Sequence, residues 1–132
     1  MTWHQLLDHV RRLGQYATEQ EAQQALDVVL GILGSQLGGD ERCALATVLP
    51  ERARATFVAP IPLTRPATAP AFVEAVARNL NTTLAQARWH TSTVLAALAD
   101  AAGPDLTDRL LAHLPRGYAF LFGRADLIAA AA

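Results

Sequence analysis

The sequence predicts an all-α protein built from two similar halves, and three observations support this prediction. Leu49-Pro50 recurs 65 residues later as Leu114-Pro115, and self-similarity at a fixed period indicates one supersecondary unit that is used twice. Apolar residues recur at the helical spacing, and no stretch of four or more residues alternates as a strand does. Alanine, the best helix former, is abundant, whereas aromatic residues make up only 6% of the chain.

The matches between the halves extend over most of the chain. At the displacement of 65 they run from Thr18 with Thr83 to Phe57 with Phe122, and upstream of Thr18 the displacement becomes 66. One half therefore has an extra residue near Gly14-Gln15.

This repeat predicts a division of the chain into a first helical repeat at residues 1–57, a Pro-rich linker at 58–69 and a second helical repeat at 70–132. We expect three helices and a short fourth in each half. Neither half is large, so we expect the two to share a core and to pack as one helical bundle around a pseudo-twofold axis.

Start signals are visible for the first two helices of each half. Three segments fit the capping box, in which a hydroxyl and an amide or carboxylate satisfy free N–H groups reciprocally: Thr2 to Gln5, Thr18 to Glu21 and Thr83 to Gln86. Pro70 suits the first turn of the helix that opens the second half.

Glycine and proline punctuate the rest of each half. Asp40 and Asp105 follow glycines, and we expect each to cap a third helix. Each Leu-Pro pair should end that third helix, because the residue before proline avoids the helical region. Each proline can then start a short fourth helix that ends near Phe57 or Phe122.

The linker should be stiff, because it contains three prolines. Ile61 and Leu63 are apolar, so we expect the linker to lie on the protein surface and not to swing free.

Composition argues against several classes of function. The net charge of −1 and the pI of about 6.4 give no electrostatic footprint for nucleic acid or for a membrane surface. Cys43 is the only cysteine, so no internal disulfide can form and we expect a cytoplasmic protein. The chain has no apolar run long enough for a membrane span and no apolar leader.

The order of these features resembles a known family. A helix with Leu-Leu-Asp-His-Val, a capped second helix, Gly-Gly-Asp, then Leu-Pro and a terminal Phe, all repeated, is similar to bacterial domain-of-unknown-function family 2267. The resemblance covers residues 3–57 and 70–123. It implies an all-helical repeated fold, and it supplies no catalytic residues.

Trp89 is the strongest candidate for an interaction residue. On a helix it lies nearly opposite the apolar stripe, among the small residues Ala85, Ser92 and Ala96. A large aromatic ring among small side chains makes a surface that another helix can approach closely, and an exposed Trp there would anchor a partner. The alternative is that Trp89 packs between the halves or under the linker.

Two weaker candidates use charge or thiol chemistry. Cys43 lies in the first turn of the expected third helix, where the helix N-terminus favours a thiolate that can be oxidised, although Asp40 and Glu41 oppose this. A phosphate could be met by Arg11, Arg12, Arg52 and Arg54. Each of these residues can also be incidental, the cysteine as a small apolar residue and the arginines as solvated helix ends.

No catalytic or cofactor motif is present. The chain has neither a Gly-x-Ser-x-Gly elbow nor a glycine-rich phosphate loop. The four histidines lack the spacing of a metal site, so we predict no cofactor and no metal. We therefore expect a non-enzymatic interaction or scaffold module, whose partner is another protein or a second copy of the chain. The alternatives are a thiol-based redox sensor or enzyme that uses Cys43, and a weak nucleic-acid-binding protein.

Overall fold

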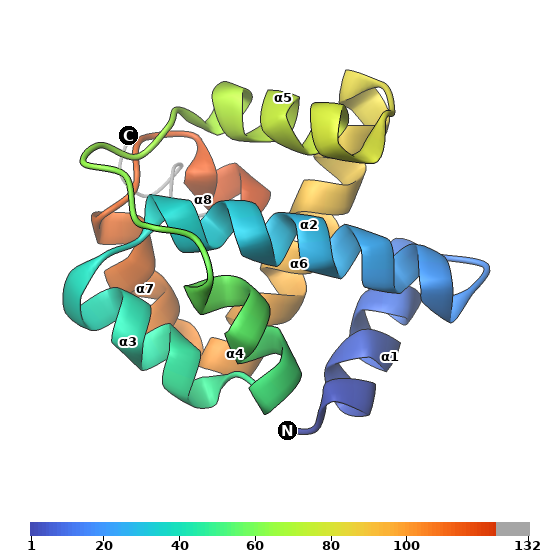
Figure 1. The fold of residues 1–132 in the computed structure, drawn as a ribbon, viewed down its shortest axis with the longest axis horizontal. Helices are drawn as coiled ribbons and strands as arrows, with labels where there is room; N and C mark the ends of the chain where they lie inside the picture. Colours follow the sequence, from blue (N-terminus) through green and yellow to red (C-terminus); the bar gives the residue numbers. More distant parts are fainter. Residues whose placement is uncertain (124–132) are drawn as a thin grey trace.

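The computed structural model describes residues 1–123, and it confirms the all-α prediction over this range (Figure 1). The elements are α1 (Trp3–Gly14), α2 (Glu19–Gln36), α3 (Gly39–Val48), α4 (Glu51–Val58), α5 (Ala69–Leu80), α6 (Leu84–Ala102), α7 (Pro104–Ala112) and α8 (Tyr118–Leu121). The described residues contain no strand. The fourth helix of the first half begins directly after Pro50, whereas α8 begins three residues after Pro115 and is a single turn.

Threonines cap the helices at the expected places. The Thr2 hydroxyl accepts from the Gln5 N–H, and the Gln5 side chain accepts from the Thr2 N–H, so this capping box is complete. The Thr18 and Thr83 hydroxyls also accept cap hydrogen bonds. At Thr83 the box is not closed, because the Gln86 side chain accepts a hydrogen bond from the Thr82 hydroxyl.

The predicted aspartate caps of the third helices are wrong. Gly38 and Gly103 are the N-cap residues of α3 and α7, and neither helix has a side-chain cap. Gly39 and Gly103 adopt positive φ values of 62° and 85°, a conformation that glycine adopts without strain, so each helix begins before its aspartate. Asp40 and Asp105 then lie in the first turn, where a carboxylate still interacts favourably with the helix dipole.

Helix α2 runs through the middle of the molecule (Figure 1). It packs against α1, α4, α5 and α6, and α6 also packs against α1, α5, α7 and α8. Most of the side chains that α2 buries are apolar: Ala22, Ala25, Leu26, Val29, Leu30 and Leu33. The exception is Gln36 at its end, whose side-chain oxygen accepts a hydrogen bond from the Ala67 N–H. Contacts between α1 and α6 and between α2 and α5 join the two predicted halves through a common core.

A glycine sets the distance between α2 and α4. A Cβ atom on Gly34 would lie 1.9 Å from the carbonyl oxygen of Phe57, well inside contact distance. Gly31, one turn earlier on the same helix, has open space at the equivalent position. Only one of the two glycines in the middle of α2 is therefore required by packing.

The linker is held on the surface by hydrogen bonds at both ends. The guanidinium of Arg42 donates to the carbonyl oxygens of Val58 and Pro60, at 3.0 and 2.7 Å. Further along, the Leu63 N–H donates to the Ser35 carbonyl at 2.8 Å, and the Tyr118 hydroxyl donates to the Ala67 carbonyl at 2.7 Å. Between these points Ile61 is 86% exposed.

The two glycines of α2 give a matched test of this packing. We expect Gly34→Ala to lower the free energy of unfolding by about 2–3 kcal/mol, because the backbone of α4 must move away. Gly31→Ala should raise it by about 0.5–1 kcal/mol, because alanine favours the helix and meets no neighbour. Urea denaturation of both variants measures the two effects. Equal effects in the two variants would contradict the close approach at Gly34.

Candidate functional site

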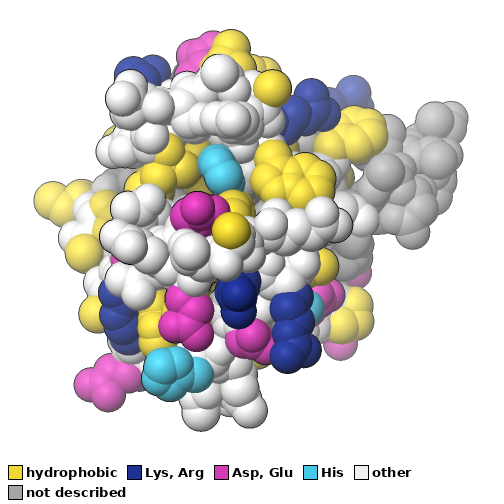
Figure 2. Space-filling model, turned by 90° about the vertical axis from the view of Figure 1, so that its right-hand side faces the viewer, with side chains coloured by type: hydrophobic (Ala, Val, Ile, Leu, Met, Phe, Trp, Pro, Cys, Tyr) yellow, Lys and Arg dark blue, Asp and Glu magenta, His cyan; other side chains and the backbone are white. Residues whose placement is uncertain are grey.

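A cavity lies where two helical turns meet, one between α1 and α2 and one between α5 and α6. Its volume is about 580 Å³, within the range of ligand-binding clefts. Figure 2 looks onto this end of the molecule and shows a histidine side chain among hydrophobic and acidic ones. Four kinds of side chain line the cavity: the aromatic rings of Tyr16, Trp89 and His90, the polar groups of Gln15, Gln24, Asn81, Thr82 and Gln86, the aliphatic groups of Ala25, Leu80 and Ala85, and the carboxylate of Glu21.

Both turns are formed in the same way. Gln15 and Asn81 adopt the left-handed conformation, with φ values of 54° and 52°, and their N–H groups bond to carbonyls of the preceding turn. A threonine cap then starts the next helix. The first turn spans residues 15–18 and the second spans 81–83, so the first is one residue longer. Tyr16 lies in this longer turn, next to the place where the sequence indicated an extra residue.

Tyr16 and His90 connect the two turns across 74 residues of sequence. The Tyr16 hydroxyl lies 2.6 Å from His90 Nδ1, and the rings stack with centroids 5.4 Å apart. Gly14 permits this arrangement, because a Cβ atom there would lie 2.2 Å from the Tyr16 ring. This contact was not predicted, and the only signal for it in the sequence is the extra residue near Gly14-Gln15.

Burial keeps both groups uncharged near neutral pH. It raises the pKa of Tyr16 to about 12, an effect opposed by a hydrogen bond from Thr93 and increased by the charge of Glu21. Burial lowers the pKa of His90 below its ordinary value of 6.5, and the charge of Glu21 partly offsets this. We therefore assign the tyrosine as the donor to Nδ1, which places the ring proton of His90 on Nε2.

Trp89 occupies the edge of the cavity. Its indole N–H donates to the carbonyl oxygen of Gly14, at the end of α1, at 3.0 Å, and 51% of its surface is exposed. Trp89 therefore contacts the other half and keeps half of its surface open to solvent. A role in anchoring a partner stays a prediction. Of the small residues beside it, Ala85 is exposed, and Ser92 and Ala96 are partly covered.

Ala85 marks a ridge between two hollows. It lines the cavity with Trp89 and also lines a second cavity of about 530 Å³ between α5, α6 and α8. The second cavity includes Leu84 and Phe120, which are 59% and 50% exposed. The first two turns of α6 thus present apolar side chains on both sides of Ala85. We name the surface formed by Leu84, Ala85, Trp89 and Phe120 the α6 face.

The four arginines that could meet a phosphate all have partners within the chain. Arg11 donates to the Ala17 carbonyl, and Arg12 pairs with Asp8 at 3.0 Å. Arg54 donates to the carbonyls of Ala46 and Leu49 at the end of α3. Arg52 lies over Trp3 at the start of α1, about 12 Å along the helix from Arg11. The four arginines therefore do not form one cluster along α1.

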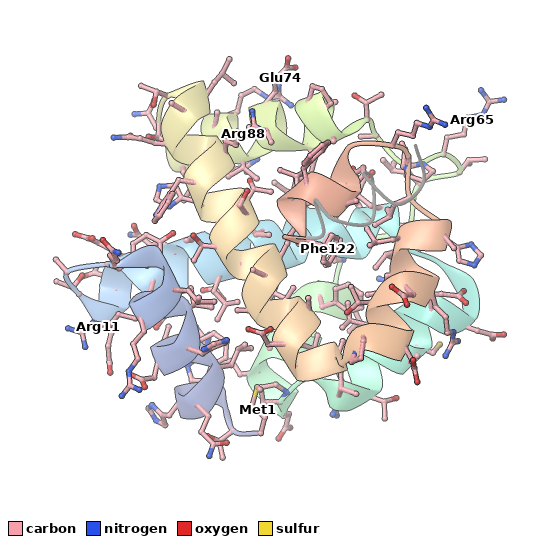
Figure 3. All side chains as sticks on the ribbon, turned by 180° about the vertical axis from the view of Figure 1, so that it is seen from behind. Met1, Arg11, Arg65, Glu74, Arg88 and Phe122 are labelled. Atoms are coloured by element: carbon pink, nitrogen blue, oxygen red, sulfur yellow. The ribbon has the colours of Figure 1, made fainter. Side chains whose placement is uncertain are left out.

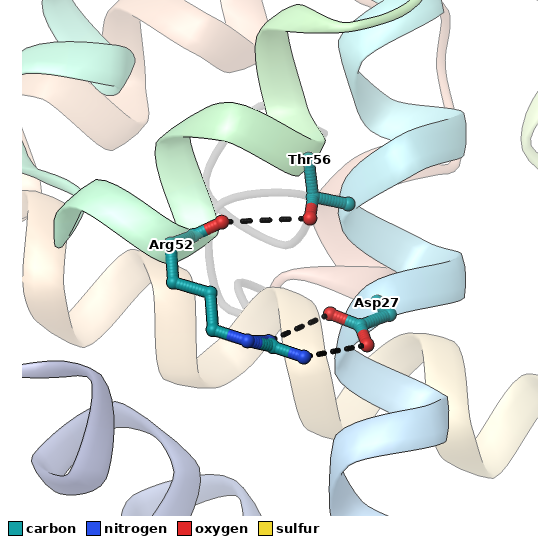
Figure 4. Close-up of polar contacts among 3 residues, drawn as sticks. All are labelled: Asp27, Arg52 and Thr56. Atoms are coloured by element: carbon teal, nitrogen blue, oxygen red, sulfur yellow. Dashed lines mark hydrogen bonds and ion pairs between the residues drawn. The ribbon is translucent and has the colours of Figure 1, made fainter.

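Arg52 holds together the start of α1, the middle of α2 and α4. Its guanidinium lies 4.0 Å from the centroid of the Trp3 ring and 3.4–3.5 Å from the carboxylate oxygens of Asp27 (Figure 4). These hydrogen bonds are long for a charged pair. Burial raises the pKa of Asp27 despite the arginine, so the ion pair does not fully offset the cost of covering the carboxylate.

Cys43 lies on the exposed surface of α3. Its carbonyl oxygen accepts a hydrogen bond from the Thr47 hydroxyl at 2.8 Å. Within residues 1–123, no group of three or more His, Cys, Asp or Glu side chains is arranged to hold a metal ion. No helix in the same range is long and apolar enough to cross a bilayer.

The fold and cavity define a small all-α protein with a hollow at the meeting of two helical turns. Residues 3–121 match the family of uncharacterized conserved proteins DUF2267, and the chain belongs to this family. This confirms the resemblance seen in the sequence. The search among curated proteins found no match.

The environment of His90 predicts a pH effect on stability. Its pKa is lower in the folded chain than in the unfolded chain, so below pH 6.5 the unfolded state binds the proton first. The contribution of His90 to the free energy of unfolding should therefore be fully present above pH 6.5. As the pH falls below 6.5, the free energy of unfolding should decrease by at most about 1.4 kcal/mol per pH unit. The groups that act on His90 are the Tyr16 phenol and the Glu21 carboxylate.

Urea denaturation between pH 5 and 8 checks this effect. The His90→Gln variant should lose the slope that the wild-type chain shows. His4 is exposed, so His4→Gln should keep the slope and serves as the control. A wild-type slope that survives in His90→Gln would assign it to other groups.

Arg52 offers a second test of stability. We expect Arg52→Ala to lower the free energy of unfolding by about 1 kcal/mol, through loss of the contact with Trp3 and the weak ion pair. Arg65 projects from the linker away from the helices (Figure 3), so Arg65→Ala should leave stability within about 0.5 kcal/mol of the wild type. Thermal denaturation measures both, and equal losses would show that Arg52 has no special role.

Proposed function

We propose that this chain is a non-enzymatic interaction or scaffold module, and that the α6 face is the surface it presents to a protein partner. The observation that carries the proposal is the position of Trp89. The residue is half exposed beside a cavity, and its indole is oriented by the bond to Gly14. Large aromatic residues that are already oriented lose little entropy on binding and often anchor interfaces.

The surroundings of Trp89 support a contact surface. Leu84 and Phe120 expose more apolar area than a single scattered residue would, and hollows lie on both sides of Ala85. A partner could insert side chains into these hollows while covering the ridge. The partner is another protein or a second copy of the chain, and we expect the contact to occur in the cytoplasm of a bacterium.

The chemistry of the cavity also favours binding over catalysis. Tyr16 stays a protonated phenol near neutral pH because its pKa is about 12, so almost no phenolate is present to act as a base. The same hydroxyl donates a hydrogen bond to Nδ1 of His90, so the unprotonated nitrogen of that ring already has a partner. The pair is suited to holding the two turns together.

The two other functions receive less support. Cys43 is exposed, but a redox role needs a reactive thiol, and slow reaction with peroxide would exclude it. Nucleic-acid binding would require Arg11, Arg12, Arg52 and Arg54 to leave the partners that they have within the chain. The absence of salt-sensitive binding to DNA or RNA would exclude it.

Truncation of the α6 face tests the proposal. We expect a self-association constant, or the capture of one defined protein from the native cell, to weaken at least about tenfold in Trp89→Ala and in Leu84→Ala. Two variants are needed because Trp89→Ala also removes the bond to Gly14, whereas Leu84→Ala does not. Analytical ultracentrifugation measures the first effect, and quantitative affinity capture measures the second.

Ile61→Ala is the control, because Ile61 is an apolar residue even more exposed than Leu84 but lies on the linker. It should behave like the wild type. A chain that stays monomeric at high concentration and captures no protein in a Trp89-dependent way would refute the proposal.

A further inference from the structure

We infer that the cavity between the two turns binds an organic cation, either a guanidinium or an alkylammonium group, against Trp89 and Glu21. The inference rests on the proposed function in one respect, since a side chain of the protein partner is one source of such a group. A free amine or guanidine is the other source. Nothing in the family match assigns a ligand to this place.

Formal charge is the first argument. Glu21 is the one acidic or basic side chain, apart from neutral His90, among the described residues that line the cavity. Its charge acts on two of the lining groups, because it adds to the raised pKa of Tyr16 and partly offsets the lowering of the pKa of His90. Arg88 lies on the same part of α6, but it lines the second cavity together with Glu74 (Figure 3). The cavity therefore carries a net negative charge.

The dipoles of the neighbouring helices do not reverse the negative charge of the cavity. Gly14 and Leu80, the last residues of α1 and α5, line the cavity and bring the negative ends of two helix dipoles to it. The first turns of α2 and α6 bring positive ends nearby, and the hydroxyls of Thr18 and Thr83 cap them. The opposed dipoles largely offset, so the carboxylate of Glu21 determines the preference.

An aromatic ring is the second argument. Cations bind over the faces of aromatic rings, and tryptophan is the strongest of these partners. The chain already makes this contact elsewhere, where the Arg52 guanidinium lies 4.0 Å from the Trp3 ring centroid. Trp89 has half of its surface free for a cation, and its bond to Gly14 sets the orientation of its ring.

Neutral acceptors complete the site. The side chains of Gln24, Asn81 and Gln86 line the same cavity, and their amide oxygens can accept hydrogen bonds from the N–H groups of a cation. The volume of about 580 Å³ accommodates a guanidinium or ammonium group with its alkyl arm. An anion would find no basic side chain among the described lining residues.

Titration of the full chain with defined cations tests the inference. The indole N–H of Trp89 is a direct probe in ¹H–¹⁵N spectra, and its signal is assigned by its absence in Trp89→Phe. Acetyl-arginine methylamide represents a partner side chain, agmatine represents a free cation, and acetyl-citrulline methylamide is the neutral control. We expect saturable shifts of the Trp89 signal with at least one cation, and none with the citrulline compound at the same concentration.

Matched carboxylate variants locate the charge. Glu21→Gln should weaken binding about fivefold, as expected for a contact with an exposed charge. Glu19 lies in the same helical turn but does not line the cavity, so Glu19→Gln should bind like the wild type. Tighter binding of the arginine compound than of agmatine assigns the site to a partner side chain, and the reverse order assigns it to a free cation.

Two results would overturn the inference: equal shifts with the citrulline compound, or equal affinity in Glu21→Gln and wild type. Either result leaves the proposed function standing if partner capture still depends on Trp89. Conversely, cation binding without any protein partner would refute the proposed function and keep the site.

Discussion

The burial of α2 on several sides at once is the constraint on which the rest of the structure depends. A helix that contacts four others cannot have large side chains at every contact, because close approach on one side limits the space on the next. The chain meets this requirement with Ala22, Ala25 and Gly34 among larger residues such as Leu26 and Leu30. The positions of α4, α5 and α6, and with them the two turns at the cavity, follow from this arrangement.

The two turns have similar local backbone structure but contribute different side chains to the cavity. Each begins with a left-handed residue and ends with a threonine cap. The first turn has room for Tyr16, which reaches across to α6, whereas the shorter second turn contributes Asn81 and Thr82. The extra residue thus lets the first turn supply an aromatic ring to the cavity, whereas the second turn supplies polar groups.

Local signals in the sequence were sufficient for the helices and insufficient for the site. Thr2, Thr18 and Thr83 marked helix starts, because a cap is formed by residues three apart. Asp40 failed as a cap because the conformation of the glycine before it moved the start of α3. The contacts of Trp89 with Gly14 and of Tyr16 with His90 join residues 74 or 75 apart. No local pattern encodes such contacts, so the exposure of Trp89 was predicted only as one of two alternatives.

The attachment of the linker has a consequence for how the chain tolerates cleavage. Arg42 and Ser35 secure its first part and Tyr118 secures its last part, while Ile61 and Arg65 between them are exposed. Pro66 protects the bond after Arg65, but a protease that cuts after leucine would find Leu63 accessible, because 56% of its surface is exposed. The two fragments would stay together, because α1 with α6 and α2 with α5 form contacts that do not depend on chain continuity. We expect a nicked protein that elutes intact from a sizing column and separates only in denaturant, so the two segments could be expressed as separate genes and reassembled.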